Sequence, residues 1–480
     1  IGPELTKRVN LIISSGILKL NEDFRILWLD NPIAKIIPGK NYLEPNIDLI
    51  TDDILNLDSK NKLIEFLNNW IKNLINTELK DLVNLNKFEQ KNSSVRALCY
   101  QLFENNGVLK RESVNEFIKK AISGNEEKIA PCIACNQACL DHTFSGKISS
   151  CLVNPKACFE TELVSTKTKH QKSIAVVGAG PAGMSAAIEA AERGHKVTLF
   201  DKAQTIGGQL NLAKMVPGKE EFWGLVDWFS EMLKSSGAEV KLGELVTSSD
   251  VVDFDEVIIA TGVSPRDPKI KGHEKNNVVS YVEVLNGTGQ IGQKVAVIGA
   301  GGIGFDVSEY LVHENKSDNK QIEIPKWMKE WGVDDTNTNR GGLNPMEIEE
   351  SPREVYMLQR KATSFGKGLN KTSGWVHRAV VKMKGVETIG GVSYDKVDDE
   401  GLHITITSGK EGNETTETRI LDVDHVVLCA GQVSVNKLHT ELDTDMGKNF
   451  NLHLVGGAEF AGELDAKRCI KLASELAASL

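Results

Sequence analysis

Four cysteines lie close together before the middle of the chain, and their spacing is that of a metal or iron–sulfur site. The pattern is C-x2-C-x3-C-x11-C, formed by Cys132, Cys135, Cys139 and Cys151. Thiolates are the ligands of structural zinc and of iron–sulfur clusters. Zinc sites usually carry two C-x2-C pairs, whereas here three cysteines share one short segment and the fourth follows alone. The spacing therefore favours a [4Fe–4S] cluster, and zinc remains the structural alternative.

The other cysteines give a simpler interpretation. Cys158 could replace Cys151 as a ligand but lies outside the best spacing, so we interpret it as a free or buried thiol, like Cys99, Cys429 and Cys469. Five of the eight cysteines fall within 27 residues. Such clustering in a long chain indicates metal ligation in a reducing compartment and not a disulfide framework. We therefore expect a cytoplasmic protein.

A glycine loop, GAGPAG, follows the cysteines at residues 178–183. An apolar run at 173–177 precedes it, and a second strand at 197–200 ends in Asp201. In a dinucleotide fingerprint the first glycine makes the turn, the second lets the backbone approach the pyrophosphate, and the third packs the helix on the strand. The acid suits ribose hydroxyls and repels a 2′-phosphate. The complete order of strand, loop, helix, strand and acid predicts a FAD or NAD site, and a glycine turn without a ligand is the alternative.

The signature repeats as GAGGIG at residues 299–304. The next strand, at 353–361, ends in Arg360 and Lys361 where the first unit has Asp201. Two cations at that position suit the 2′-phosphate of NADPH, although an ordinary solvated pair is the alternative. The contrast between the units assigns FAD to the first and NADPH to the second. Two dinucleotides on one chain imply hydride transfer between them.

Further segments complete the predicted sites. The segments IGGQL (206–210) and ATG (260–262) have the spacing of two-dinucleotide flavoproteins, and His377 and Arg378 face either the cofactor or the solvent. No catalytic acid or base is assigned. The residues predicted to bind the dinucleotides are Gly178, Gly180, Pro181, Ala182, Gly183, Asp201, Lys202, Gly208, Gln209, Thr261, Gly262, Gly299, Gly301, Gly302, Ile303, Gly304, Arg360, Lys361, Gly431 and Gly457.

The elements that must position these residues predict an α/β protein. We expect two Rossmann-like dinucleotide-binding domains of the two-dinucleotide flavoprotein type, with no TIM barrel. A cysteine-rich cluster segment and a mostly helical N-terminal arm precede them. Within the arm, apolar spacing predicts helices at 63–85, 95–110 and 112–123, and residues 22–50 resemble short strands and turns. The predicted domains are an N-terminal region at 1–117, a cysteine segment at 118–165, a FAD domain at 170–290 with 433–480, and an NADPH domain at 291–432.

The bulk composition is that of a globular protein. The 480 residues carry a net charge of −10, which argues against a nucleic-acid binder as a whole. No apolar run approaches the roughly 20 residues that span a bilayer. We therefore expect no membrane association, and no nucleic-acid partner except through the N-terminal arm.

From about residue 118 to its end, the chain resembles the C-terminal half of bacterial NADPH-dependent 2,4-dienoyl-CoA reductases, relatives of trimethylamine dehydrogenase. The resemblance rests on the cysteine segment at 133–158, both glycine loops, MLQRKAT (357–363) and GLNKTSGWVHR (368–378). Ala134 stands where the family usually has glycine. The resemblance implies the electron path NADPH to FAD to [4Fe–4S] to FMN to substrate.

The resemblance also implies what is missing. Family members begin with a TIM barrel that carries FMN and the residues that protonate the dienoyl-CoA. Such a barrel needs at least about 200 residues, and residues 1–117 neither fit one nor show its strand–helix alternation. The family's active-site Tyr and His, and its FMN site, therefore have no matching positions here.

The N-terminal arm has a resemblance of another kind. Residues 37–50 and 95–114 resemble the accessory region of a bacterial DExH-type helicase, although the helicase ATP site is absent. This resemblance implies a fusion or a chimeric gene model.

Three hypotheses follow. The first is an NADPH-dependent flavin and iron–sulfur oxidoreductase that reduces a small-molecule acceptor but no dienoyl-CoA. The second is an electron-input subunit that serves a separate, FMN-containing or other catalytic protein. The third is a helicase-derived RNA-binding module with a passive C-terminal part.

Overall fold

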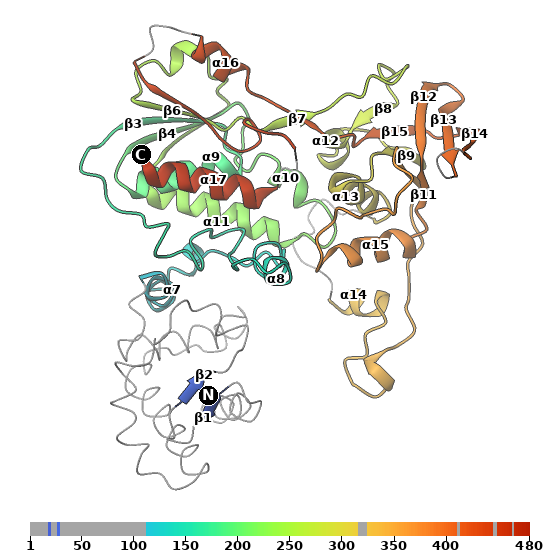
Figure 1. The fold of residues 1–480 in the computed structure, drawn as a ribbon, viewed down its shortest axis with the longest axis horizontal. Coiled ribbons are helices and arrows are strands. Elements are labelled where there is room, and N and C mark those ends of the chain that lie inside the picture. The colour runs from blue at the N-terminus through green and yellow to red at the C-terminus, as the bar shows by residue number, and fades with distance from the viewer. Residues whose placement is uncertain are drawn as a thin grey trace. The chain divides into compact units, whose positions relative to one another are not determined.

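The computed structural model describes two short strands near the N-terminus and most of the chain after residue 111 (Figure 1). The described ranges are 18–20, 26–28, 112–314, 324–409, 413–444, 449–462 and 465–480. The chain divides into two compact units, Ile1–Ile129 and Ala130–Leu480. No helix among the described residues is long and apolar enough to cross a bilayer.

In the first unit, strands β1 (Leu18–Leu20) and β2 (Ile26–Trp28) pair antiparallel. Helix α7 (Glu112–Ile122) confirms the helix predicted at 112–123, and the 3-10 turn η1 (Glu126–Lys128) follows it. The helices predicted at 63–85 and 95–110 lie outside the described residues.

The second unit contains two parallel sheets. The first has the strand order β17-β6-β3-β4-β5 and carries the first glycine loop (Figure 1). Helices α9, α11 and α17 cover one of its faces, and α16 lies on the other side. The elements are β3 (Ser173–Val177), α9 (Pro181–Glu192), β4 (Lys196–Asp201), α10 (Leu210–Ala213), α11 (Glu221–Ser236), β5 (Glu239–Leu242), η2 (Ser248–Asp250), β6 (Glu256–Ile259), α16 (Lys437–Asp443), β17 (Asn451–Leu454) and α17 (Ala466–Ser479).

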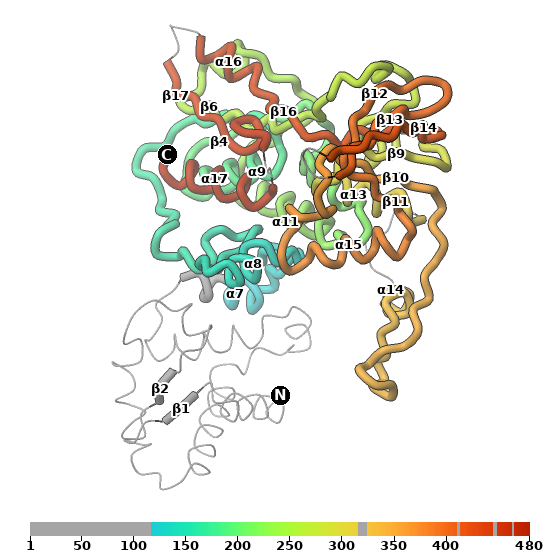
Figure 2. The backbone as a smooth tube through the Cα atoms, turned by 45° about the vertical axis from the view of Figure 1, so that its right-hand side comes forward, coloured from blue at the N-terminus to red at the C-terminus, as the bar shows by residue number. Residues whose placement is uncertain are grey.

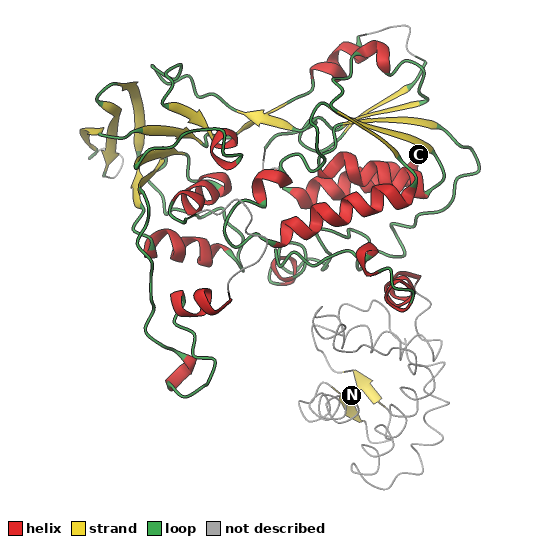
Figure 3. Cartoon of the chain, turned by 180° about the vertical axis from the view of Figure 1, so that it is seen from behind, coloured by secondary structure: helices red, strands yellow, loops and turns green. Residues whose placement is uncertain are grey.

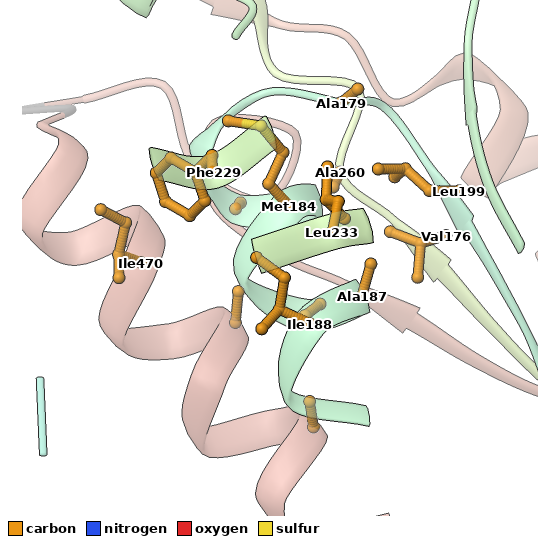
Figure 4. Packing of buried hydrophobic residues seen from close by; sticks show 14 of the residues in the cluster. Val176, Ala179, Met184, Ala187, Ile188, Leu199, Phe229, Leu233, Ala260 and Ile470 are labelled. Carbon is orange, nitrogen blue, oxygen red and sulfur yellow. The ribbon is translucent and has the colours of Figure 1, made fainter. Parts of the chain in front are cut away.

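Strand β3 shows why this sheet is buried on both faces. Ile174 and Val176 point into the core under α9, α11 and α17, which Figure 4 shows around Met184 and Phe229. Ala175 and Val177 point the other way, into the core under α16. Alternate side chains of a strand face opposite sides, so a continuous apolar run is what a doubly covered parallel strand requires.

The second sheet has the strand order β11-β10-β9-β15-β8 and repeats this design. Figure 2 labels three of its strands, β9, β10 and β11, near β12, β13 and β14. Val295 and Val297 of β9 pack under helices, whereas Ala296 and Ile298 pack under a separate antiparallel sheet, β12-β13-β14. The elements are β8 (Val278–Ser280), α12 (Tyr281–Leu285), β9 (Lys294–Ile298), α13 (Gly302–Leu311), α14 (Ile324–Glu330), η3 (Arg340–Gly342), β10 (Glu354–Gln359), α15 (Gly374–Met383), β11 (Glu387–Gly390), β12 (Val392–Asp398), β13 (Gly401–Ser408), β14 (Thr415–Leu421) and β15 (His425–Leu428).

A two-stranded antiparallel ribbon joins the two sheets. It consists of β7 (Val263–Pro265) and β16 (Gln432–Ser434), and Figure 3 shows it between the two sets of strands. The chain crosses to the second sheet after β7, because β8 pairs with β15 there. The predicted domain boundary at residue 290 placed β8 and α12 in the first domain. A strand of three residues carries too little pattern to be assigned from sequence.

Candidate functional site

The first glycine loop lies between β3 and α9, and its three glycines have different surroundings. Gly178 has φ +111°, and a Cβ atom there would stand 2.4 Å from the carbonyl oxygen of Ala260. A Cβ atom at Gly183 would stand 1.7 Å from the carbonyl oxygen of Gly178. A Cβ atom at Gly180 would meet no protein atom within 4 Å. The fold therefore requires the outer two glycines, while the middle one borders open space at the start of α9.

The second loop, between β9 and α13, has the same geometry. Gly299 has φ +115°, and its Cβ atom would stand 2.3 Å from the carbonyl oxygen of Cys429. A Cβ atom at Gly304 would stand 1.8 Å from the carbonyl oxygen of Gly299. Gly301 and Gly302 again meet nothing within 4 Å. Open space at a helix N-terminus, where backbone N–H groups and the helix dipole favour an anion, suits a pyrophosphate.

The predicted residues beside the glycines lie at the same two helix ends. Pro181 and Ala182 begin α9, and Ile303 lies in the first turn of α13. Asp201 ends β4, the neighbour of β3, and its carboxylate accepts hydrogen bonds from the backbone N–H groups of Ala179 (2.6 Å) and Ala203 (2.8 Å). This places a negative charge against the first loop. Lys202 follows it and is exposed.

The segment predicted from IGGQL lies against the first loop. The N–H of Gly207 donates to the carbonyl oxygen of Ala179 at 2.8 Å. Gly208 has φ +53°, and a Cβ atom there would stand 2.9 Å from the Cα atom of Gly180. Glycine at this position therefore permits the turn to approach the loop closely. The side chain of Gln209, which follows, receives a hydrogen bond from Tyr281.

The remaining predicted glycines lie where the sheets meet the ribbon or α17. Thr261 donates its hydroxyl hydrogen to the carbonyl oxygen of Val435, beside Gly262, which has φ +75°. Gly431 has φ +100° and precedes β16. The backbone of Gly457 hydrogen-bonds to the thiol of Cys469 in α17.

Arg360 and Lys361 follow β10, which pairs with β9 as β4 pairs with β3. Both side chains are exposed, and across the described part of the chain neither forms an ion pair. The Gln359 side chain donates a hydrogen bond to the backbone carbonyl of Lys361 at 2.8 Å, which helps to fix the backbone that carries both cations. Two unpaired cations thus stand where the first unit has the Asp201 carboxylate.

The four cysteines of the predicted cluster come together at the edge of the first sheet's core. Cys135 and Cys151 pack against that core, whereas Cys132 and Cys139 are exposed. Burial, and to a smaller extent the three other thiols, raise the pKa of Cys135 to about 11. Burial also raises the pKa of Cys151, with Cys132 and Cys139 contributing. A bound cation would have to displace these protons, because metals are ligated by thiolates.

The spacing of the sulfurs bears on the choice of metal. A tetrahedral zinc ion, with Zn–S bonds of about 2.3 Å, holds its sulfurs about 3.8 Å apart. Among the described residues, only Asp398, Glu400 and His403 bring three ligand atoms within 4.8 Å of one another, so no three of the four sulfurs do. The thiols are therefore not already at the spacing of a closed zinc site.

Backbone N–H groups point at the two half-buried sulfurs. Gln137 donates to the sulfur of Cys135, and Val153 and Asn154 donate to that of Cys151. Hydrogen bonds to ligand sulfurs stabilise the thiolate form and tune the reduction potential of a bound cluster. Sequence spacing identifies the cysteines but carries no signal for these donors.

The cysteine loop is strained at Ala134, which has φ +53°. A left-handed conformation costs an alanine about 1–2 kcal/mol, while glycine adopts it freely. We expect Ala134→Gly to stabilise the loop by up to about 1 kcal/mol, since the greater entropy of glycine in the unfolded chain offsets part of the gain. Native-state hydrogen exchange of the Ser150 amide, which donates to Ala138 at 2.7 Å, would report this as slower exchange.

The matched control is Asn136→Gly. Asn136 has φ +57°, but asparagine tolerates this region better than alanine does. Its replacement is therefore expected to slow exchange of the Ser150 amide less. Equal effects at the two positions would contradict the assignment of strain to Ala134.

The cysteine segment also contacts the second dinucleotide unit. Asp141, in helix α8 (Leu140–Thr143), accepts hydrogen bonds from the backbone N–H (2.9 Å) and the hydroxyl (2.6 Å) of Thr372. Thr372 belongs to the loop that follows Arg360 and Lys361. Sequence analysis missed Asp141, because its partner lies 231 residues away and no local pattern marks the pair.

His377 and Arg378, which the sequence left open, are both bonded to protein groups. Nδ1 of His377 lies 2.7 Å from a carboxylate oxygen of the buried Glu309, and Arg378 donates to the carbonyl oxygen of Gly366 at 3.2 Å. The hydrogen bond to the carboxylate of Glu309 raises the pKa of His377, while burial raises the pKa of Glu309. These contacts join α15 to α13 and to the loop before it.

Comparison with known proteins gives a family match. Residues 172–452 match the model of the pyridine nucleotide-disulphide oxidoreductase family. The "Metal reductase" of Desulforamulus reducens is 31% identical over 72% of this chain and 49% of its own length. The "Cinnamate reductase" of Clostridium sporogenes is 28% identical over 72% of this chain and 45% of its own length. The chain thus spans about half the length of these curated relatives.

Solved structures show the same fold. A 2-naphthoyl-CoA reductase complex has a TM-score of 0.62 at 24% identity and covers 76% of this chain and 48% of its own. Histamine dehydrogenase from Rhizobium sp. 4-9 has a TM-score of 0.58 at 19% identity and covers 76% of this chain and 50% of its own. These relatives give no support to the helicase resemblance of residues 37–50 and 95–114.

Proposed function

Because the chain belongs to the pyridine nucleotide-disulphide oxidoreductase family, and so is a flavin-dependent, NAD(P)H-using oxidoreductase, we propose that it passes electrons from NADPH through FAD to a [4Fe–4S] cluster. One arrangement carries this proposal: each sheet holds a glycine loop with an open middle glycine, and two of the four cysteines, Cys135 and Cys151, pack against the core of the first sheet. When bound, the flavin would convert the paired electrons of a hydride into the single electrons that a cluster accepts.

The residues of this chain have distinct tasks in the proposal. Gly180 leaves space for the pyrophosphate of FAD, and Asp201 accepts hydrogen bonds from its ribose. Gly301 leaves the corresponding space for NADPH. Cys132, Cys135, Cys139 and Cys151 supply four thiolates. None of these steps needs a protein acid or base, because positioning and tuned potentials suffice.

The choice of NADPH over NADH rests on Arg360 and Lys361. We expect the double substitution Arg360→Ala, Lys361→Ala to lower the ratio of kcat/KM for NADPH to that for NADH about 10–100-fold, since the phosphate contacts of these two exposed side chains together are worth about 1.5–3 kcal/mol. NADH itself should be oxidised almost as before. Steady-state kinetics with both nucleotides provides the measurement.

Lys367→Ala is the matched control for this pair. Lys367 is exposed in the same loop but follows the end of β10 by eight residues, so its loss should leave the nucleotide preference unchanged. An unchanged nucleotide preference in the double variant would show that the 2′-phosphate does not bind at Arg360 and Lys361.

The exposed side of the cysteine segment suggests where electrons leave. Cys132 and Cys139 are exposed, and so are the neighbouring side chains of Leu140, Phe144 (67%) and Ile148 (65%). An acceptor can approach the cluster from this side. The acceptor that we propose is a small redox molecule or an FMN-containing partner.

A single anaerobic experiment tests the proposed function. The purified chain is reconstituted with FAD, iron and sulfide, and NADPH is then added. We expect bleaching of the flavin absorbance, an electron paramagnetic resonance signal of a reduced cluster, and turnover with ferricyanide. Failure to bind FAD, or to bind iron and sulfide, would overturn the electron path. Reduction of a dienoyl-CoA by the chain alone would contradict the proposed limit of its activity.

A further inference from the structure

The hydroxyl of Tyr281 joins two glutamines from distant parts of the chain. Tyr281 is the first residue of α12 and is only 2% exposed. Its hydroxyl donates to the side-chain oxygen of Gln209 at 3.3 Å and accepts a hydrogen bond from the side-chain nitrogen of Gln432 at 2.8 Å. Burial raises the pKa of this phenol, so the hydroxyl keeps its proton and can donate.

The three residues belong to three different parts of the fold. Gln209 ends the turn that lies against the first glycine loop. Tyr281 is fixed to the second sheet, because α12 directly follows β8 and is held by a capping box between Ser280 and Glu283. Gln432 begins β16, one strand of the ribbon that connects the sheets. The hydroxyl therefore links both dinucleotide units and the connection between them.

Other contacts of the same segment point in the same direction. Val216, which follows α10, is 1% exposed and packs in the core of the second sheet with Tyr281 and Phe305. Three residues later, Lys219 forms an ion pair with Asp306 of α13 at 2.6 Å. The segment between β4 and α11 is thus anchored on the unit that carries the second glycine loop.

We propose that the Tyr281 hydroxyl is a clasp that holds the two dinucleotide units in one orientation, and that Tyr281, Gln209 and Gln432 are positioning residues for hydride transfer. The inference rests on the proposed function only in assuming that a hydride passes from a nicotinamide to a flavin. A hydride, with its two electrons, moves from the reduced nicotinamide to the oxidised flavin only if the reacting atoms are held about 3–3.5 Å apart. A ribbon of two short strands is a natural hinge, and a hydrogen-bonded side chain beside it would restrict the hinge motion.

The test uses Tyr281→Phe, which removes the hydroxyl and keeps the ring. Hydrogen exchange is measured for the ribbon amides of Arg266, which donates to Gly431, and Val435, which donates to Gly262. We expect these amides to exchange about 5–30-fold faster, the effect of losing one or two hydrogen bonds, while the amides of β3 and β9 keep their rates. Flavin reduction by NADPH should slow by a similar factor, with little change in the KM for NADPH.

Tyr356→Phe is the matched control, because among the described residues that hydroxyl donates a hydrogen bond only to Glu354 of the same strand, β10. It should leave the ribbon amides and flavin reduction unchanged. Tyr281→Phe could accelerate exchange throughout the chain. In that case Gln432→Met is the deciding variant, because it keeps the phenol of Tyr281 and removes the side chain that donates a hydrogen bond to it. Exchange is then measured at the same ribbon amides.

If the exchange rates of the ribbon amides are unchanged in the deciding variant, the Tyr281 hydroxyl does not hold the two dinucleotide units together. Ribbon exchange that rises without slower flavin reduction would overturn its role in hydride transfer. Because exchange is measured on the chain with or without cofactors, it reports on the clasp even if the proposed electron path fails.

Discussion

Replacing Gly183 with alanine is expected to destabilise the first dinucleotide unit by about 3 kcal/mol or more and to abolish FAD retention. The added Cβ atom would stand 1.7 Å from the carbonyl oxygen of Gly178, and that oxygen belongs to the backbone. No side-chain rotation relieves such a clash, so α9 must move away from the loop and from β3. The thermal unfolding midpoint of the flavin-free chain measures the first effect, and the flavin content of the chain after reconstitution with FAD measures the second.

Gly180→Ala separates the requirement of the fold from that of the ligand. Gly180 has an extended backbone conformation, with φ −77° and ψ −177°, and a Cβ atom there would meet nothing within 4 Å. We expect the free energy of unfolding of this variant to lie within about 1 kcal/mol of that of the parent. The variant should nevertheless lose FAD, because the methyl group would occupy the space proposed for the pyrophosphate. If Gly180→Ala retains FAD with unchanged affinity, the dinucleotide does not bind at this loop.

The second loop offers the same pair of variants. Gly304→Ala would meet the carbonyl oxygen of Gly299 at 1.8 Å, and Gly301→Ala would meet nothing. The first should destabilise the protein, and the second should weaken NADPH binding alone. The parallel behaviour of two loops, more than either one, would show that the open glycines serve ligands.

Features encoded within one short segment could be predicted from the sequence. Strand, glycine loop and helix span fewer than thirty residues in each unit, so residues 173–192 and 294–311 form the expected β3–α9 and β9–α13 pairs. The coarse fold, two parallel α/β units with dinucleotide-type loops, is confirmed by the topology and by the family match. Local pattern suffices here because the periodicity and the glycine positions are both local.

Features that depend on distant partners could not be predicted. The antiparallel sheet β12-β13-β14 covers Ala296 and Ile298 of β9, but nothing near β9 indicates which segment supplies that cover. The bonds of Gln209 to Tyr281 and of Asp141 to Thr372 likewise join residues that no spacing rule connects. These long-range contacts set the arrangement of the units around the site.

The cysteine segment shows the same division. Spacing selected four cysteines, and the structure brings their sulfurs within mutual electrostatic influence. The spacing could not show that Cys135 and Cys151 are half-buried while Cys132 and Cys139 are exposed, since burial depends on the core of the first sheet. The distinction matters chemically, because the half-buried pair accepts hydrogen bonds from backbone N–H groups, whereas the exposed pair faces the solvent.

Replacing Cys135 with serine is expected to prevent assembly of the cluster. Its sulfur is one of four proposed ligands, and a serine hydroxyl is a poor substitute for a thiolate with iron. Iron and acid-labile sulfide, expected at about four atoms each per chain in the parent from the [4Fe–4S] formula, should fall to less than about one. The broad visible absorbance of the cluster should disappear while the flavin bands remain, because none of the proposed FAD contacts involves Cys135.

Cys158→Ser is the matched control for this substitution. Cys158 lies in the same segment and is partly buried, but its position falls outside the predicted ligand spacing. This variant should keep its iron and sulfide. If replacing Cys158 removes the cluster and replacing Cys151 does not, then Cys158 is the fourth ligand and Cys151 is not. Stoichiometric zinc with no sulfide in the parent would instead establish the structural alternative, and the electron path would then end at the flavin.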